Sequence, residues 1–228
     1  MSEKLALIFG AGHKLSASLA KVFSKDGFRV CLVARNIEKL NHLESEIGAV
    51  LLKGDVSNMR SVLDVFSSVD KINPSPEVVI FNPSMRVKGA IEKLDPKEVE
   101  KANKTNVMGA FYVAQQAAFR MILSGRGSIF FTGATAGIKG FPNSSVFAMG
   151  KFALRGLAQS LARELHPKNI HIGHFVIDGQ IKDENKTPSV SVNTIDPDEI
   201  AKTYLHFYRQ KKSCWTWEIE LRHANESF

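Results

Sequence analysis

Cysteine and long apolar runs are scarce in this chain of 228 residues, and each absence excludes a class of protein. The two cysteines, Cys31 and Cys214, lie far apart and form no CxxC pair, so we expect neither a disulfide framework nor a metal site. No apolar run reaches the ~18–20 residues that a membrane-spanning helix needs. The segment Met1–Leu5 leads into an apolar stretch without the pattern of a signal peptide. The sequence therefore predicts a cytoplasmic protein with no membrane contact.

Charge of one sign does not dominate any stretch of the chain. The 30 Lys and Arg residues against 23 Asp and Glu residues give a net charge of +7, but the longest basic run, Arg209–Lys212, is interrupted by Gln210. Scattered cations mostly form solvated surface, and an anionic cofactor or acyl substrate explains the excess as well as nucleic acid does. We expect a small-molecule substrate and no nucleic-acid partner.

Short apolar segments alternate with longer amphipathic ones, which is typical of repeated βα units around a parallel sheet. The predicted strands are Lys4–Gly10, Phe28–Ala34, Ala49–Lys53, Val78–Phe81, Ser128–Phe131, His171–Val176 and Thr216–Leu221. The predicted helices are Leu15–Lys25, Ile37–Glu46, Met59–Val69, Pro96–Leu123, Phe147–Leu165 and Pro197–Arg209. We expect one α/β domain over residues 1–228, with a doubly wound parallel sheet of about seven strands and helices on both faces.

Three local features refine this outline. Pro96 and Pro197 each follow an aspartate, which is a cap-then-proline start for a helix. His171 and His174 have a spacing that suits a metal site on a helix, but on a strand they point to opposite faces, so no metal site is expected. The polar segment 180–196 is the one long loop, and it follows a strand end on the ligand side of the sheet.

A glycine turn follows the first predicted strand. The segment Leu5–Phe9 runs into Gly10-Ala11-Gly12 and then into a helix. A dinucleotide pyrophosphate binds at such a place, because bare backbone and a helix N-terminus face the phosphates, although a plain βα turn has the same pattern. His13 and Lys14 add positive charge beside this turn.

The end of the second strand indicates which dinucleotide binds. It reads Val33-Ala34-Arg35-Asn36 and has no acidic residue to accept a hydrogen bond from a ribose 2′-hydroxyl. Arg35 suits a 2′-phosphate instead, although it can also extend along the sheet edge without a ligand. The sequence therefore favours NADP(H) over NAD(H).

With Asp55, Asn82, Asn106 and Lys151 added to the strand pattern, the chain resembles the short-chain dehydrogenase/reductase family from Leu5 to about Leu221. The resemblance implies a single NAD(P)-binding Rossmann-type domain that transfers hydride to or from carbonyls, alcohols or some C=C bonds. It also implies a homodimer or homotetramer, formed through the helices Pro96–Leu123 and Phe147–Leu165.

The resemblance places the cofactor along several loops. Of the three glycines in the family turn, only Gly10 is kept in register, since Lys14 and Ser16 replace the other two. Asp178 replaces the proline that frames the nicotinamide, and it can stabilise the oxidised ring or cap the loop. The cofactor-binding residues that we expect are Gly10, Gly12, His13, Lys14, Leu15, Arg35, Asn36, Asp55, Val56, Asn82, Pro83, Ser84, Asn106, Lys151, Gly179 and Ile181.

The catalytic set of the family is only half present. Asn106 and Lys151 match its Asn and Lys, but Ala134 and Phe147 occupy the positions of its Ser and Tyr. A tyrosine four residues before Lys151 would share its helix face and serve as the proton donor. Phe147 has no proton to give, so a replacement donor is needed. The candidates are Thr135 and Ser145, and beside them Thr132, Ser144, Ser84 and Arg86.

Two functions follow from this pattern. The first is an NADP(H)-dependent oxidoreductase with an atypical active site around Asn106, Lys151, Thr135 and Ser145. The alternative is a catalytically silent NADP(H)-binding protein that senses redox state or stabilises a partner. Both hydroxyls are lost while the residues expected to bind the cofactor are kept. This combination favours a changed function of the active site over random loss of function.

Overall fold

The computed structural model describes residues 4–183 and 193–226. Its helices and strands follow one another in the order β1 (Leu5–Phe9), α1 (Leu15–Lys25), β2 (Arg29–Ala34), α2 (Asn41–Ile47), β3 (Val50–Lys53), α3 (Met59–Asp70), β4 (Val78–Phe81), α4 (Pro96–Asn103), α5 (Gly109–Ser124), β5 (Gly127–Thr132), α6 (Ser145–Leu165), β6 (Ile170–Asp178), β7 (Gln180–Ile181), β8 (Thr194–Ile195), α7 (Pro197–Arg209) and β9 (Glu218–Arg222). The predicted α/β class is confirmed.

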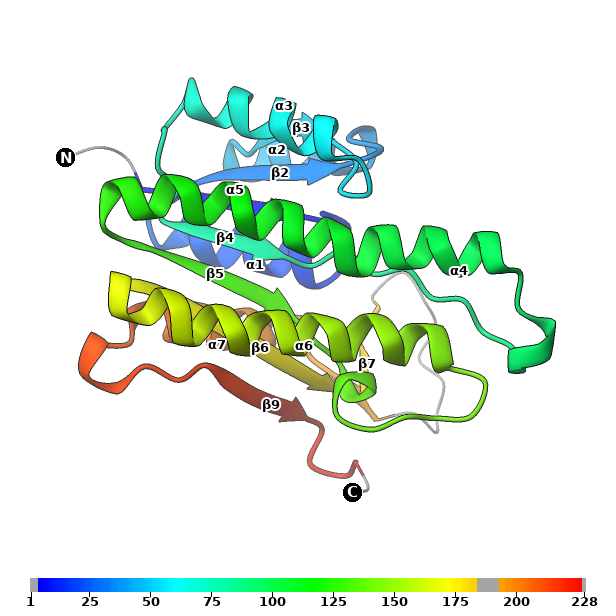
Figure 1. Ribbon diagram of the computed structural model, residues 1–228. Coiled ribbons are helices and arrows are strands. Elements are labelled where there is room, and N and C mark those ends of the chain that lie inside the picture. The colour runs from blue at the N-terminus through cyan, green and yellow to red at the C-terminus, as the bar shows by residue number, and fades with distance from the viewer. Residues whose placement is uncertain (1–3, 184–192, 227–228) are drawn as a thin grey trace.

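Seven strands form one parallel sheet in the order β3-β2-β1-β4-β5-β6-β9 (Figure 1). The chain leaves β1 toward β2 and β3 on one side and returns to β4 on the other, so the strand order reverses between β1 and β4. Ligands of open α/β sheets bind at the carboxyl ends of the strands on either side of such a reversal. The topology therefore points to the loops after β1 and β4.

Both faces of the sheet are covered by helices, as the apolar strands predicted (Figure 1). Along β1 the side chains alternate: Leu5, Leu7 and Phe9 pack toward α3, α5 and α6, whereas Ala6 and Ile8 pack toward α1, α2 and α7. All five are buried. This burial on both faces fixes the register of β1 and with it the position of the turn that follows.

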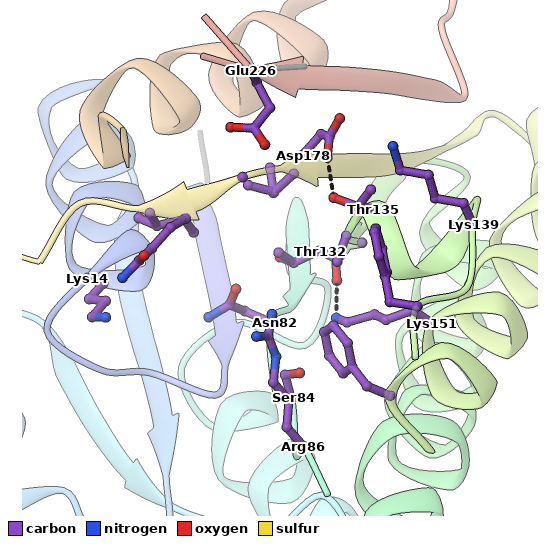
Figure 2. A pocket seen from close by; sticks show the side chains of 18 of the residues that line it. Lys14, Asn82, Ser84, Arg86, Thr132, Thr135, Lys139, Lys151, Asp178 and Glu226 are labelled. Carbon is purple, nitrogen blue, oxygen red and sulfur yellow. Dashed lines mark hydrogen bonds between the residues drawn. The ribbon is translucent and has the colours of Figure 1, made fainter. Parts of the chain in front are cut away.

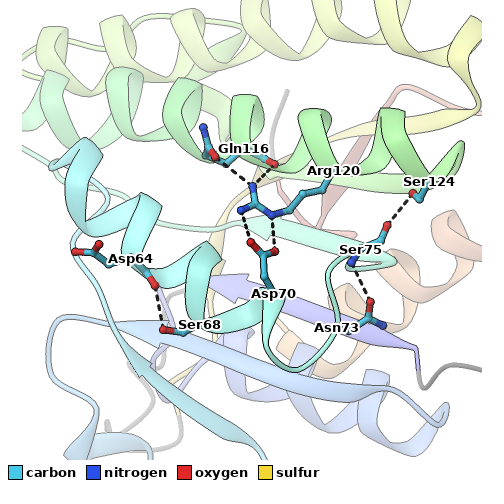
Figure 3. Close-up of polar contacts among 8 residues, drawn as sticks. All are labelled: Asp64, Ser68, Asp70, Asn73, Ser75, Gln116, Arg120 and Ser124. Atoms are coloured by element: carbon cyan, nitrogen blue, oxygen red, sulfur yellow. Dashed lines mark hydrogen bonds and ion pairs between the residues drawn. The ribbon is translucent and has the colours of Figure 1, made fainter.

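An ion pair fixes α5 against α3 (Figure 3). The guanidinium of Arg120 donates from Nε and Nη2 to the two carboxylate oxygens of Asp70, each at 2.7 Å. Its Nη1 donates to the backbone and side-chain oxygens of Gln116, one turn earlier on α5. A bidentate, partly buried pair of this kind holds one geometry, so α5 is a rigid support for the residues before it.

The structure corrects two predicted elements. The helix predicted over Pro96–Leu123 is divided, because a π-helical turn at Lys104–Met108 separates α4 from α5. The segment predicted as a loop over 180–196 contains the short parallel ladder of β7 and β8. Residues 184–192 of that segment lie outside the described part of the chain.

The two histidines of β6 point to opposite faces of the sheet, as predicted. His171 stacks on Trp215 and Phe207, whereas His174 bonds to Glu218 through Nδ1 at 2.9 Å. No helix within residues 4–183 and 193–226 is long and apolar enough to cross a membrane.

Candidate active site

The turn after β1 has a shape that only glycine adopts easily at its first position. Gly10 has φ +75°, and a Cβ there would lie 2.6 Å from the backbone nitrogen of Pro83. The N–H groups of Gly10 and Ala11 both donate to the carbonyl of Val33, at 3.0 Å each. The turn is thus held between the ends of β2 and β4, at the reversal of strand order.

Ser16, which replaces a glycine of the family pattern, closes this turn from inside. Its Oγ accepts from the N–H of Gly12 at 2.9 Å and donates to the carbonyl of Gly10 at 3.3 Å. Asn82 Nδ2 donates to the same carbonyl at 3.2 Å. The serine and the asparagine therefore hold in place a loop that other members shape with bare glycine, a role that the sequence did not reveal.

The N-terminus of α1 offers an anion site. Lys14 is its N-cap and makes no side-chain capping bond, and bonding within α1 begins only with the N–H of Ala17, which donates to the carbonyl of Lys14 at 2.8 Å. The N–H groups before it, those of Leu15 and Ser16, therefore suit an external anion. Lys14 Nζ lies 2.9 Å from Asp183 Oδ2, and His13 Nε2 lies 3.2 Å from Asp183 Oδ1. The two predicted phosphate neighbours are therefore at the turn, and both contact a carboxylate that an anion would replace. Leu15, the other residue predicted there, is buried.

A cavity of about 400 Å³ lies beside the turn on the β2 side. It brings together most of the residues predicted for the adenosine half of the cofactor, and it is lined by Gly10, Ala11, Val33, Ala34, Arg35, Gly54, Asp55, Val56, Asn82, Pro83, Ser84, Met85 and Thr105. Asn36 does not line it; its side chain instead accepts a hydrogen bond from the N–H of Glu38 at 3.1 Å. Arg35 is exposed at the rim of this cavity.

A larger cavity of about 1060 Å³ opens on the other side of Asn82 (Figure 2). It extends from Lys14 at the first turn to Lys151 on α6, and its wall includes Gly179 and Ile181 after β6. The nicotinamide half of the cofactor and the substrate were predicted for this region. Both cavities share Asn82 and Ser84, so they form a path from the end of β2 to α6.

Lys151 is the buried cation of the large cavity. Only 3% of it is exposed, and its Nζ donates to the carbonyl of Thr132 at 2.7 Å. Burial, and next the positive charge of Arg86, lower the pKa of Lys151 to about 7. The ammonium is therefore poised to release and regain a proton at neutral pH.

Lys151→Met is expected to stabilise the free protein by about 1–3 kcal/mol at pH 6.5, because an unpaired ammonium is no longer buried. The native pKa of about 7 lies below the ordinary lysine value of 10.5, so between these values the unfolded chain binds more protons and native stability rises with pH. The gain from Lys151→Met should therefore fade toward pH 10. Thermal unfolding across this pH range measures it, and a gain independent of pH would contradict the lowered pKa.

Phe147 occupies the tyrosine position, directly beside Lys151. Its ring is 6% exposed, and the ring centroid lies 5.7 Å from Lys151 Nζ. The guanidinium carbon of Arg86 lies over the same ring at 4.1 Å. Ala134, at the serine position, lines the same cavity. The cavity thus brings Lys151 together with the residues at both hydroxyl positions, but neither of these residues has a hydroxyl.

The two proposed replacement hydroxyls are placed differently. Thr135 lines the cavity, but its Oγ1 donates its proton to Asp178 Oδ1, and Asp178 also pairs with Arg222 Nη2 at 2.7 Å. Thr135 can therefore accept a hydrogen bond from a substrate but has no proton left to donate. Ser145 begins α6 and does not line the described part of either cavity.

Tyr204 of α7 contacts the same residue as Lys151, Thr132, but it packs on the opposite face of the sheet from α6 and is out of reach of a substrate. Tyr204 is fully buried and shares a hydrogen bond of 2.9 Å with Thr132 Oγ1. Burial raises the pKa of Tyr204, which keeps its proton in place. Tyr204 supports the end of β5, whose Thr132 carbonyl accepts the hydrogen bond of Lys151, and it supplies no acid.

Asn106 lies on the π-helical turn and points at the loop after β4. Its Oδ1 accepts from the N–H of Met85 at 2.7 Å, and its Nδ2 donates to the carbonyl of Met85 at 2.8 Å. The amide is 3% exposed and lines neither of the two cavities as far as the structure describes them. Its geometry makes it a clamp that fixes the backbone next to Arg86.

Comparison with known proteins identifies the family to which this arrangement of residues belongs. A family model described as short chain dehydrogenase matches residues 4–187. A solved short-chain dehydrogenase from Rhodopseudomonas palustris is 35% identical, with a TM-score of 0.84 over 96% of this chain and 98% of that one. Among curated relatives, the 3-oxoacyl-[acyl-carrier-protein] reductase of Bos taurus is 24% identical over 172 residues, which is 75% of this chain and 73% of the relative.

The fold agrees with a more distant structure as well. A metagenomic short-chain oxidoreductase solved in complex with NADP is 23% identical and has a TM-score of 0.85 over 98% of both chains. At this identity the likeness shows the fold alone. The family match covers the turn after β1, α6 and every lining residue of the two cavities except Glu226. The chain therefore belongs to the short-chain dehydrogenase family of oxidoreductases, as its motifs predicted.

Proposed function

We propose that this protein is an NADP(H)-dependent oxidoreductase that acts on a carbonyl, an alcohol or an activated C=C bond of a small organic molecule. One observation carries the proposal: the turn at α1 and the buried Lys151 open into the same cavity of about 1060 Å³. A cation at an uncapped helix end suits a pyrophosphate, and a buried lysine at the far end suits proton transfer. A purely structural role would rarely require both the cation at the helix end and the buried lysine.

The donor set fits a dinucleotide phosphate. Lys14 and the first N–H groups of α1 would hold the pyrophosphate, Arg35 the 2′-phosphate, and the wall at Gly179 and Ile181 the nicotinamide. Once bound, the nicotinamide supplies or accepts the hydride. The residues of the chain supply the remaining steps. Lys151 holds a proton at Nζ, and Thr135 orients the substrate by accepting a hydrogen bond from it. Phe147 excludes water from its side of the cavity.

Arg35→Ala is expected to weaken NADPH binding by about 10- to 100-fold and to leave NADH binding unchanged, because a charge-assisted bond contributes about 1.5–3 kcal/mol. Calorimetric titration with both dinucleotides measures the preference. Lys39→Ala is the matched control, since Lys39 is an exposed cation of the same segment that does not line the cavity. Equal losses for NADPH and NADH in Arg35→Ala would show that Arg35 does not contact the 2′-phosphate.

A catalytically silent NADP(H)-binding protein is the second candidate. The observation in its favour is that the tyrosine hydroxyl is absent and the proton of Thr135 is already bonded to Asp178. A panel of carbonyl and enone compounds separates the two functions. Binding of NADPH without oxidation above background across that panel would favour the silent protein.

A homodimer or homotetramer is part of the proposal. Several large apolar side chains of α5 and α6 are exposed, among them Phe111, Met149 and Phe152. Phe111 also lines an apolar groove of about 280 Å³ between the two helices, together with Leu154 and Leu157 of α6. An apolar patch on two neighbouring helices is typical of a subunit contact. The mass of the protein in solution measures the assembly.

A further inference from the structure

Three cations line the substrate end of the large cavity without a carboxylate partner. They are Arg86 and Lys88 from the loop after β4, and Lys139 from the loop after β5. Within residues 4–183 and 193–226, none of the three forms an ion pair. The two loops are joined, since the N–H of Gly89 donates to the carbonyl of Asn143 at 3.1 Å. The cations therefore belong to one wall.

The acidic residues of the cavity do not neutralise this wall. Asp178 is bonded to Thr135 and paired with Arg222 at 2.7 Å, so its charge is already compensated. Glu226 lies on the far side of the cavity from Arg86 (Figure 2). The space between Lys139, Arg86 and Lys151 is thus electropositive, with no anion from the described chain inside it.

Arg86 is the best placed of the three to contact a ligand. The clamp of Asn106 on Met85 fixes the backbone next to it, and its guanidinium lies on the ring of Phe147 at 4.1 Å. A contact with an aromatic ring uses the charge of a guanidinium and none of its N–H groups as hydrogen-bond donors to oxygen. None of those five donors makes a hydrogen bond within the described residues.

Two cations share one aromatic ring here. Lys151 Nζ and the guanidinium carbon of Arg86 lie 5.7 and 4.1 Å from the centroid of Phe147. The charge of Arg86 helps to lower the pKa of Lys151, so the two cations repel each other, and an anion bound close to both reduces that repulsion. The phenylalanine therefore does more than omit a hydroxyl: it is the platform that holds the guanidinium over the cavity.

We propose that this wall binds an anionic group of the substrate, so that the oxidoreductase acts on carbonyl or enone compounds that carry a carboxylate or a phosphate, with Arg86 as the residue that contacts it. This inference rests on the proposed function, since it names the substrate class of the same cavity. Lys88 and Lys139 raise the local concentration of the anion, and Arg86 supplies the directed bonds.

Binding of matched acid and ester pairs tests the inference. The probes are 4-oxopentanoate and 5-oxohexanoate with their methyl esters, and dihydroxyacetone phosphate with dihydroxyacetone. Each is titrated calorimetrically into the full chain, with and without NADPH. We expect at least one anion to bind tenfold or more tightly than its neutral partner, and Arg86→Gln to remove about tenfold of that affinity. The acid and phosphate arms identify which anion is preferred.

Two further variants serve as controls for Arg86→Gln. Arg86→Lys keeps the charge but loses the planar fork, so it should recover part of the affinity. Lys97→Gln removes an exposed cation of α4 away from the cavity and should change nothing. Equal binding of acid and ester in the wild type, no binding of any anion, or equal loss for both in Arg86→Gln would overturn the inference. Absence of NADPH binding would instead overturn the proposed function.

Discussion

Phe147→Tyr combined with Ala134→Ser is expected to raise carbonyl reduction by NADPH about 10²–10⁴-fold, the factor that a positioned general acid contributes. The new phenol would stand beside Lys151 Nζ, which lies 5.7 Å from the present ring centroid. Two cations, Lys151 and Arg86, would stabilise the phenolate and so lower its pKa. Ala134 lines the same cavity, so its added hydroxyl meets the substrate carbonyl.

The double variant has an internal control. Adding Lys151→Met to it should abolish the gain, because the phenol then loses the neighbour that lowers its pKa. Activity is followed as the loss of NADPH absorbance with anionic and neutral carbonyl compounds. If the double variant folds and binds NADPH but gains no activity, Lys151 does not act on position 147, and the oxidoreductase proposal loses its main support.

Gly10→Ala is expected to lower the free energy of unfolding by about 3 kcal/mol and to weaken NADPH binding. The methyl group would meet the backbone of Pro83 at 2.6 Å, in a residue whose φ is +75°. Left-handed backbone costs roughly 1–2 kcal/mol for an alanine, and an overlap with main-chain atoms adds about as much. Neither strain can be relieved by turning a side chain.

Gly12→Ala is the matched control. A Cβ at Gly12 meets nothing within 4 Å, and its φ is not in the left-handed region. We expect this variant to be within about 0.5 kcal/mol of the wild type, as surface substitutions usually are. Chemical denaturation of both variants measures the difference. Equal stability of the two would mean that the turn relaxes away from Pro83.

Structural elements that depend only on residues close together in the sequence were predictable. The helices α4 and α7 begin at Pro96 and Pro197 as predicted, because the preceding aspartates accept hydrogen bonds from N–H groups two residues on. The π-helical turn before α5 was not predictable. It coincides with the bonds of Asn106 to Met85, which join segments that lie far apart in the sequence.

The candidate site, too, has features that the sequence predicts and features that it does not. Its motif residues Gly10, Asn82 and Lys151 all line the two cavities, because Gly10 and Asn82 directly follow β1 and β4, and Lys151 lies on α6. The interaction of Thr135 with Asp178 was hidden, since no pattern of residue types tells where a hydroxyl proton goes. The contact of Arg86 with Phe147 was hidden too, because the loop after β4 must pack against α6 to create it.

Ser16 affects the binding of a dinucleotide as well as the shape of the turn after β1. A turn built from glycines loses backbone freedom when it closes around a phosphate, and that lost entropy weakens the complex. Here the Oγ bonds to Gly10 and Gly12 order the turn while the chain folds. The entropy is therefore lost before any ligand arrives, and a dinucleotide meets a loop that is already preorganised.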